Sequence, residues 1–128
     1  MAVWTFFNYV EKSGRNPFRE WLRDLPDEDQ AKIDHRLLQM AGMPPPWPEK
    51  WISKYQGTKE IFEFRITGNK VQYRPLGTYF GKLRYVVLVG AIEKGDKIPK
   101  SDIETAEQRL ANLQGDLSHA VIHNFDDE

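Results

Sequence analysis

The chain has 128 residues, 40% hydrophobic and 29% charged, which suits one domain that folds without disulfides. It contains no cysteine, and this excludes a disulfide framework, a thiolate zinc site and a cysteine nucleophile. No run approaches the ~20 apolar residues of a membrane-spanning helix, and the first residues lack the features of a signal peptide, so we expect a cytoplasmic protein without a membrane partner.

The net charge of -1 conceals an uneven distribution of charge along the chain. Residues 50–100 contain eleven basic residues against four acidic ones, a local net charge of +7, and the rest of the chain carries -8. A local excess of this size suits a polyanion such as nucleic acid. A solvated face without a partner is the alternative that composition leaves open.

The first 42 residues predict a strand and two helices. Residues 2–10 are rich in aromatic and β-branched residues, as strands are. Asn16 and Pro17 suit the N-cap and the first position of a helix, and Asp27 followed by Gln30 predicts a capping box for a second helix. Helical spacing predicts that the following apolar residues face inward: Phe18, Trp21, Leu22, Leu25, Ile33, Leu37, Leu38 and Ala41.

After Gly42 the pattern changes to β structure. The four prolines of residues 43–48 predict a rigid surface connection, because proline fixes φ and lacks a donor. Residues 61–66 and 71–76 alternate in polarity around a Gly-Asn turn at residues 68–69, which predicts a hairpin.

The last third of the chain predicts a central strand and one more helix. Residues 83–92 are almost continuously apolar, as in a strand buried on both faces. Ser101 and Glu104 predict a capping box for the final helix. We therefore expect an α+β domain over residues 1–114, with a small antiparallel sheet of about four strands, an N-terminal helical hairpin and a C-terminal helix. The acidic tail, residues 115–128, is expected to be frayed or loosely docked.

Two arginines and two lysines are the main candidates for binding a phosphate. Arg65 and Arg74 fall on the paired strands of the predicted hairpin, where two guanidiniums can flank one phosphate. Lys94 and Lys97 follow the predicted central strand. The open alternative is that both arginines are edge-strand charges, paired with Glu63 or left in water.

The same segment carries aromatic residues among its charges. Tyr73, Tyr79, Phe80 and Tyr85 suit stacking on unpaired bases, although Tyr73 and Tyr85 are equally consistent with core residues whose hydroxyl is satisfied. His119 and His123 have a metal-ligand spacing, but no ordered acidic partner is evident, so we predict no metal and no cofactor.

Several of these segments together resemble a known toxin family. They are residues 51–55, 61–66, 71–74, 85–94, 97–99 and 103–109, with Glu-x-Arg-Ile, Tyr-Arg and Lys-x-x-Lys-x-Pro elements in that order. In this combination the chain resembles the phage-derived Gp49-like branch of the RelE/ParE toxin superfamily, which includes the HigB toxins. The family fold, a twisted antiparallel sheet with helices packed on it, agrees with the predicted elements.

The resemblance implies the toxin of a type II toxin-antitoxin system, which cuts messenger RNA on the ribosome without a metal and is neutralised by a helix-turn-helix antitoxin. It implies that Arg65 and Arg74 hold the phosphate, that Lys94 and Lys97 steer RNA and assist proton transfer, and that Tyr73 stacks on a base or donates a proton. Further RNA contacts are expected from Lys54, Lys59, Tyr79, Lys82, Arg84 and Lys100.

The chain departs from the family pattern at its C-terminus. RelE-type toxins often keep a catalytic Tyr or His close to the end, whereas this chain offers His119 and His123 in a longer tail. Two alternatives therefore stay open: a non-catalytic inhibitor of DNA gyrase of the ParE kind, and an inactive prophage-derived protein that only binds a partner.

Overall fold

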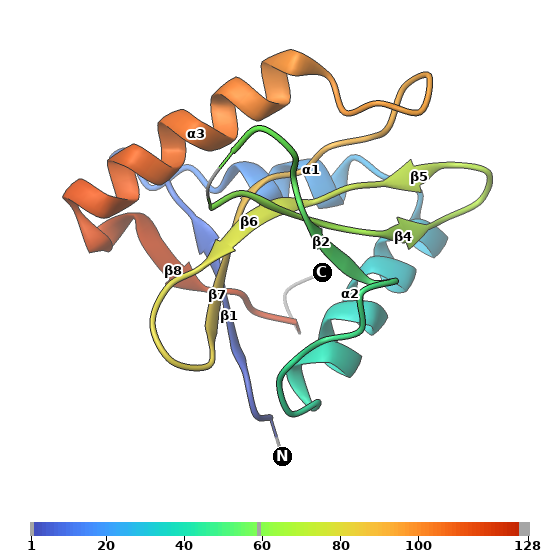
Figure 1. Cartoon of the computed structure of the whole chain (residues 1–128), viewed down its shortest axis with the longest axis horizontal. Helices are drawn as coiled ribbons and strands as arrows, with labels where there is room; N and C mark the ends of the chain where they lie inside the picture. The colour runs from blue at the N-terminus through green and yellow to red at the C-terminus, as the bar shows by residue number, and fades with distance from the viewer. Residues whose placement is uncertain (1, 59, 126–128) are drawn as a thin grey trace.

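A six-stranded mixed sheet forms the centre of the computed structural model, which describes residues 2–58 and 60–125 (Figure 1). The strand order is β2-β3-β6-β7-β1-β8, and β4 with β5 forms a separate two-stranded sheet. The strands are β1 Thr5–Tyr9, β2 Ile52–Lys54, β3 Phe62–Phe64, β4 Ile66–Thr67, β5 Gln72–Tyr73, β6 Leu76–Tyr79, β7 Arg84–Val89 and β8 Ala120–Ile122. The predicted α+β class is confirmed, but this sheet has six strands rather than about four.

The sheet is mixed because β1 runs parallel to β7, whereas all its other neighbouring strands are antiparallel. Two helices, α1 (Pro17–Arg23) and α2 (Asp27–Ala41), follow β1 before the chain enters the rest of the sheet. The prediction of a wholly antiparallel sheet was wrong, since strand patterns do not reveal which distant strand becomes a neighbour.

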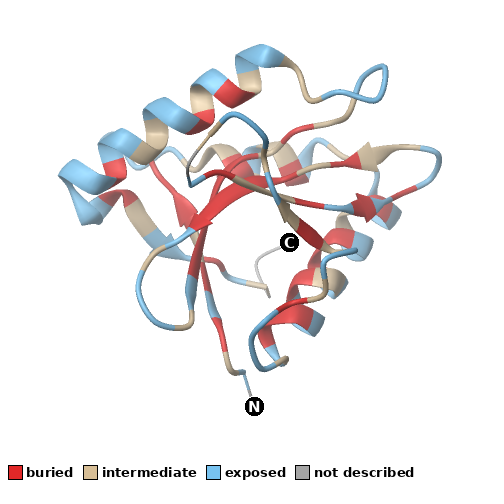
Figure 2. Cartoon of the chain, in the orientation of Figure 1, coloured by how far each residue is buried: buried red, intermediate tan, exposed pale blue. Residues whose placement is uncertain are grey.

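β7 lies in the middle of the sheet and is almost wholly buried (Figure 2). Its side chains alternate between two hydrophobic clusters. Tyr85 and Val87 join the cluster to which α1 and α2 contribute, while Val86 and Leu88 join the cluster of α3 (Lys100–Gly115). The prediction of a strand buried on both faces is confirmed. Therefore α1 and α2 cover one face of the sheet, and α3 covers the other.

The helix starts agree only in part with the predictions. Asn16 caps α1 by accepting a hydrogen bond from a backbone N–H, as predicted. The two predicted capping boxes were wrong, because Pro26 and Pro99 occupy the N-cap positions of α2 and α3 and neither helix has a side-chain cap. Both α2 and α3 start at the residue that follows a proline, so Asp27 already lies inside α2 and Ser101 inside α3.

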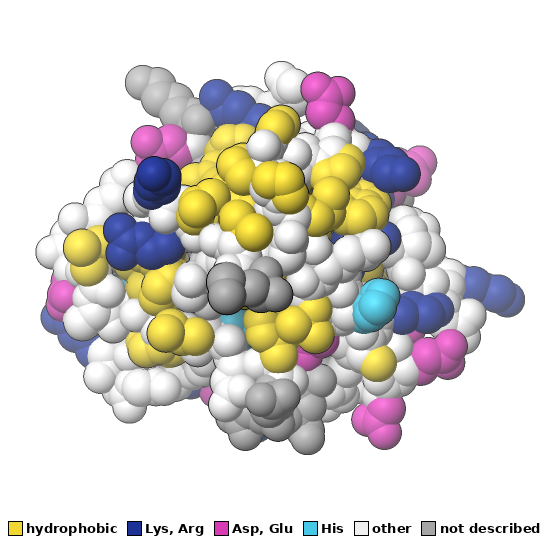
Figure 3. Space-filling view, turned by 90° about the horizontal axis from the view of Figure 1, so that it is seen from below, with side chains coloured by type: hydrophobic (Ala, Val, Ile, Leu, Met, Phe, Trp, Pro, Cys, Tyr) yellow, Lys and Arg dark blue, Asp and Glu magenta, His cyan; other side chains and the backbone are white. Residues whose placement is uncertain are grey.

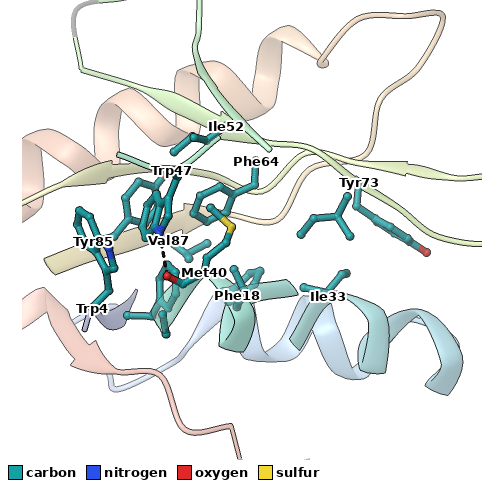
Figure 4. Close-up of a cluster of buried hydrophobic side chains, with 14 of the residues drawn as sticks. Trp4, Phe18, Ile33, Met40, Trp47, Ile52, Phe64, Tyr73, Tyr85 and Val87 are labelled. Carbon is teal, nitrogen blue, oxygen red and sulfur yellow. Dashed lines mark hydrogen bonds between the residues drawn. The ribbon is translucent and has the colours of Figure 1, made fainter. Parts of the chain in front are cut away.

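The proline-rich connection contributes to the core, which the prediction of a surface segment missed. Trp47 is only 4% exposed, its Nε1 donates to the carbonyl of Met40 at 2.8 Å, and its ring stacks 5.6 Å from Phe6 (Figure 4). Met40 is also buried, whereas Leu38, predicted to face inward, is 52% exposed. Trp47 thus lies among the aromatic rings of the core, at 4.2–5.8 Å between ring centroids from Trp4, Phe6, Phe64, Tyr79 and Tyr85.

The tail is not frayed over its described part. After α3 a short 3-10 helix, Leu117–His119, leads into β8, which pairs antiparallel with β1. His123 is buried and contacts Asp34 and Asn8. Residues 126–128 lie outside the described residues, and the division at residue 114 remains a prediction.

The face seen in Figure 3 carries patches of hydrophobic side chains.

Candidate nucleic-acid interface

A cleft of about 1090 Å³ lies where β2, β3, the loop after β7 and the start of α3 meet. Six basic side chains line it, Lys54, Arg65, Arg74, Lys94, Lys97 and Lys100, together with three carboxylates, Glu63, Glu93 and Asp96. Six minus three gives the lining a net charge of +3. The structure thus brings six of the eleven predicted site residues to one cleft.

A tight turn presents Lys94 and Lys97 to this cleft. The backbone N–H of Lys94 donates to the carbonyl of Lys97 at 2.7 Å, and the reverse bond is 3.1 Å long. Gly95 and Asp96 between them both have positive φ, at 56° and 63°, as in the primed turns of hairpins. Residues directly opposite in an antiparallel pair project to the same face, so the two ammonium groups lie on one side of the turn.

Arg65 is the more accessible of the two arginines. Its side chain is 49% exposed, and its Nη2 atom lies 3.2 Å from both Glu63 Oε1 and Ser53 Oγ. In the described part of the chain, its Nε and Nη1 atoms make no hydrogen bond. Arg65 therefore keeps donors for a ligand while Glu63 holds it in place.

Arg74 is held more firmly. Its Nη2 atom pairs with Glu93 Oε2 at 2.8 Å, and its Nη1 atom donates to the carbonyl of Tyr73 at 3.0 Å. The side chains of Arg74 and Glu93 are 12% and 18% exposed. Both arginines thus share the cleft, and both are paired with carboxylates. The Arg65–Glu63 pair is the one that the open alternative named, whereas the Arg74–Glu93 pair was not predicted. A phosphate can reach Arg65 more readily than Arg74.

Tyr73 does not line the cleft. It is 2% exposed, and it stands at the edge of the core on the side of Ile33 (Figure 4). Its hydroxyl donates to Asp29 Oδ2. Burial, together with the Asp29 hydrogen bond and charge, raises the pKa of Tyr73 to about 12, so the phenol stays protonated near neutral pH.

Three other predicted RNA contacts do not line the cleft, although Tyr79 lines an adjoining hollow with Lys54 and Arg65. Lys82 and Arg84 are exposed at the β6–β7 turn, the end of this hairpin opposite to Arg74. Tyr79 is 36% exposed and packs edge-on against Phe62, at 4.9 Å between ring centroids. Lys59 lies outside the described residues.

Nine of the fifteen residues that line the cleft were not among the predicted site residues. Ser53 and Tyr55 belong to the lining, and Tyr55 supplies an aromatic ring where Tyr73 and Tyr79 do not. Tyr55 adjoins Lys54 in the sequence, a basic-aromatic pair that could have marked it. Strand alternation would have placed the two on opposite faces, but β2 ends at Lys54 and the rule stops applying there.

The histidines of the tail also lie outside the cleft. His119 is buried, and its Nδ1 atom lies 2.7 Å from the carbonyl oxygen of Val10. His123 is 3.0 Å from the Asn8 amide nitrogen and 3.1 Å from Asp34 Oδ1. Among residues 2–58 and 60–125, no group of three His, Asp or Glu side chains could hold a metal ion. The same residues contain no helix long and apolar enough to cross a membrane.

The chain is an α+β protein with a basic cleft, and sequence comparison assigns its family. Residues 20–111, well over half of the chain, match the family described as phage derived protein Gp49-like. The chain therefore belongs to the Gp49-like family, which is a family of RelE/HigB-type toxins. The predicted resemblance is confirmed. No curated protein matches the chain.

Proposed function

We propose that this chain is the toxin of a toxin-antitoxin system, that it acts in the cytoplasm as an endoribonuclease on translated messenger RNA, and that a helix-turn-helix antitoxin neutralises it. One observation carries the nuclease proposal. In the described part of the chain, Lys54, Lys94, Lys97 and Lys100 form no ion pair, and all four line the cleft of Arg65. Unpaired cations gathered in a hollow favour a polyanion as the ligand.

The cleft combines two kinds of cation that suit one phosphate. The planar guanidinium of Arg65 can direct two N–H donors at phosphate oxygens, whereas the ammonium groups of Lys94 and Lys97 act as point charges. Tyr55 lies in the same cleft and provides a ring on which an unpaired base can stack. Single-stranded RNA offers both the phosphates and the accessible bases.

The proposed reaction needs no metal. The ribose 2′-oxygen forms a bond to the adjacent phosphorus, the bond from phosphorus to the 5′-oxygen breaks, and the products are a 2′,3′-cyclic phosphate and a 5′-hydroxyl. Arg65, Lys94 and Lys97 stabilise the negative charge that develops on the phosphorane. The 2′-hydroxyl proton passes to a base, for which Glu63 and Glu93 are the cleft carboxylates beside the arginines, and a lysine ammonium protonates the leaving oxygen.

The test compares two double variants that each remove two positive charges. Lys94→Ala/Lys97→Ala removes both ammonium groups of the turn from the cleft, and Lys12→Ala/Arg15→Ala removes two exposed charges outside the cleft. We expect the wild type and the Lys12/Arg15 variant to arrest growth on induction and to create new 5′ ends within transcripts, detected by primer extension. The Lys94/Lys97 variant should lose about 10²-fold or more of the cleavage.

Two outcomes would contradict the nuclease proposal. The first is growth arrest with intact transcripts while the purified protein inhibits gyrase supercoiling without RNA or ribosomes, which would favour a gyrase inhibitor. The second is continued growth with intact transcripts, which would favour an inactive partner-binding protein.

A further inference from the structure

A second group of cations surrounds the indole of Trp51, outside the cleft. The guanidinium carbon of Arg36 lies 4.5 Å from the centroid of this ring, and the ammonium nitrogen of Lys50 lies 5.9 Å from it. Trp51 is half-buried directly before β2, and Arg36 comes from α2. Arg36, Lys50 and Trp51 together are called the Trp51 surface below.

Arg65 connects the Trp51 surface to the cleft. Its backbone carbonyl accepts a hydrogen bond from Arg36 Nη1 at 3.0 Å, and its backbone N–H donates to the carbonyl of Trp51 at 2.9 Å. Its side chain lines the cleft. Arg65, which lies between β3 and β4, thus borders both the cleft and the Trp51 surface.

The cations of this surface are available to a ligand. In the described residues neither Arg36 nor Lys50 forms an ion pair with a carboxylate, and Lys50 is exposed. Arg36 is partly buried, and this burial lowers the pKa of its guanidinium. Beside it lies a hollow of about 570 Å³, lined in part by Lys32, His35 and Thr67. A partly desolvated cation over an indole attracts a stacked base more strongly than a solvated one does.

We propose that the Trp51 surface is a second RNA subsite, which binds the single strand flanking the phosphate held in the cleft. This inference rests on the proposed function and goes beyond it by naming where the strand continues. A base stacks on the paired planes of Arg36 and Trp51, and Lys50 contacts a phosphate of the same strand. The alternative is that Arg36 merely ties α2 to the sheet.

RNA length separates the subsite from the cleft. Fluorescence anisotropy would measure the binding of two oligoribonucleotides, one of about four nucleotides and one of about twelve, to the full chain. We expect the wild type to bind the long RNA at least about tenfold more tightly, because the long RNA gains a stacked base and a further phosphate contact. Arg36→Ala and Lys50→Ala should weaken the long RNA several-fold and leave the short RNA unchanged. Lys94→Ala/Lys97→Ala should weaken both.

Failure of this inference differs from failure of the proposed function. If Arg36→Ala leaves the long RNA unaffected while Lys94→Ala/Lys97→Ala weakens both probes, the second subsite does not exist and the RNA-binding cleft stands. If the wild type binds neither probe, both proposals are wrong. Because Arg36→Ala also removes a backbone hydrogen bond, photocrosslinking of wild-type protein to a long RNA containing 4-thiouridine provides a second test: a crosslink at Trp51 or its neighbours supports the subsite, and crosslinks confined to the cleft overturn it.

Discussion

Arg65 and Arg15 are both arginines paired with a carboxylate, yet only Arg65 lies in the cleft. Arg15 is 55% exposed and bonds to Glu20 at 2.9 Å, while Arg65 is 49% exposed and lies 3.2 Å from Glu63. Comparing Arg65 with Arg15 therefore tests the effect of lying in the cleft, because the two side chains have the same chemistry and similar exposure. We expect Arg65→Ala to lower kcat/KM for RNA cleavage by about 10- to 100-fold, because a charge-assisted phosphate contact contributes 1.5–3 kcal/mol, and Arg15→Ala to leave it unchanged. Equal effects of the two substitutions would show that net charge alone matters.

Tyr73 illustrates a residue whose role the structure changes. Folding raises its pKa from 10.0 to about 12, so the folded state retains a proton that the unfolded state loses between these values. Its contribution to stability is therefore full below pH 10 and declines as the pH rises toward 12. Tyr73→Phe removes the bond to buried Asp29, and we expect it to cost about 1–3 kcal/mol near neutral pH.

The free energy of unfolding of both proteins, measured by urea titration at several pH values, checks this interpretation. The gap between wild type and Tyr73→Phe should narrow above pH 10, because only the wild type loses this contribution. Tyr79 and Tyr85, whose pKa values burial also raises, affect both proteins alike. A gap that stays constant to pH 12 would show that the Tyr73 proton is not held by the fold.

At the scale of elements, the sequence correctly predicted the features that depend on local signals. The Asn16-Pro17 start of α1, the β4–β5 hairpin around residues 68–69 and the buried strand β7 all depend on neighbours within a few residues. The parallel pairing of β1 with β7 and the pairing of β8 with β1 join residues far apart in the chain. Such pairing is decided by the whole fold, so no local pattern indicated it.

The attachment of β8 depends on a buried polar contact that can be tested by substitution. His123 lies between Asn8 and Asp34, and all three side chains are almost fully buried. His123→Ala would leave both partners without this contact inside the protein. We expect it to lower the free energy of unfolding by about 2–4 kcal/mol, whereas His35→Ala, at an exposed position of α2, should change it by less than about 0.5 kcal/mol.

Urea unfolding followed by tryptophan fluorescence would measure both histidine variants. Since His123 is outside the cleft, RNA binding by the folded fraction should be unchanged in both. A His123→Ala protein as stable as His35→Ala would mean that the segment after α3 contributes little to the fold.

At the scale of the whole molecule, the cleft is an assembly of separated segments. Residues 53–56, 63–65, 74 and 93–103 meet there, and sequence reasoning identified the charge excess of residues 50–100 because it is a property of composition. It could not show which of those charges share a face. Lys82 and Arg84 belong to the same basic segment, but they lie at the turn of the β6–β7 hairpin, whereas Arg74 lies at its other end. The two ends of a strand are separated by its length, so residues close in the sequence can lie far from the cleft.

The summed charge of the cleft predicts how RNA binding depends on salt. Each phosphate of a single strand that a cation neutralises contributes about -0.7 to the slope of log K against log salt concentration. In the described residues, Lys54, Lys94, Lys97 and Lys100 form no ion pair with a carboxylate, so four such contacts give a slope of about -3. Anisotropy titrations of a short oligoribonucleotide between about 50 and 200 mM salt would measure it. Lys94→Ala/Lys97→Ala should make the slope shallower by about 1.4, whereas Lys12→Ala/Arg15→Ala should leave it unchanged. An unchanged slope in the Lys94/Lys97 variant would mean that RNA does not enter the cleft, whatever its affinity.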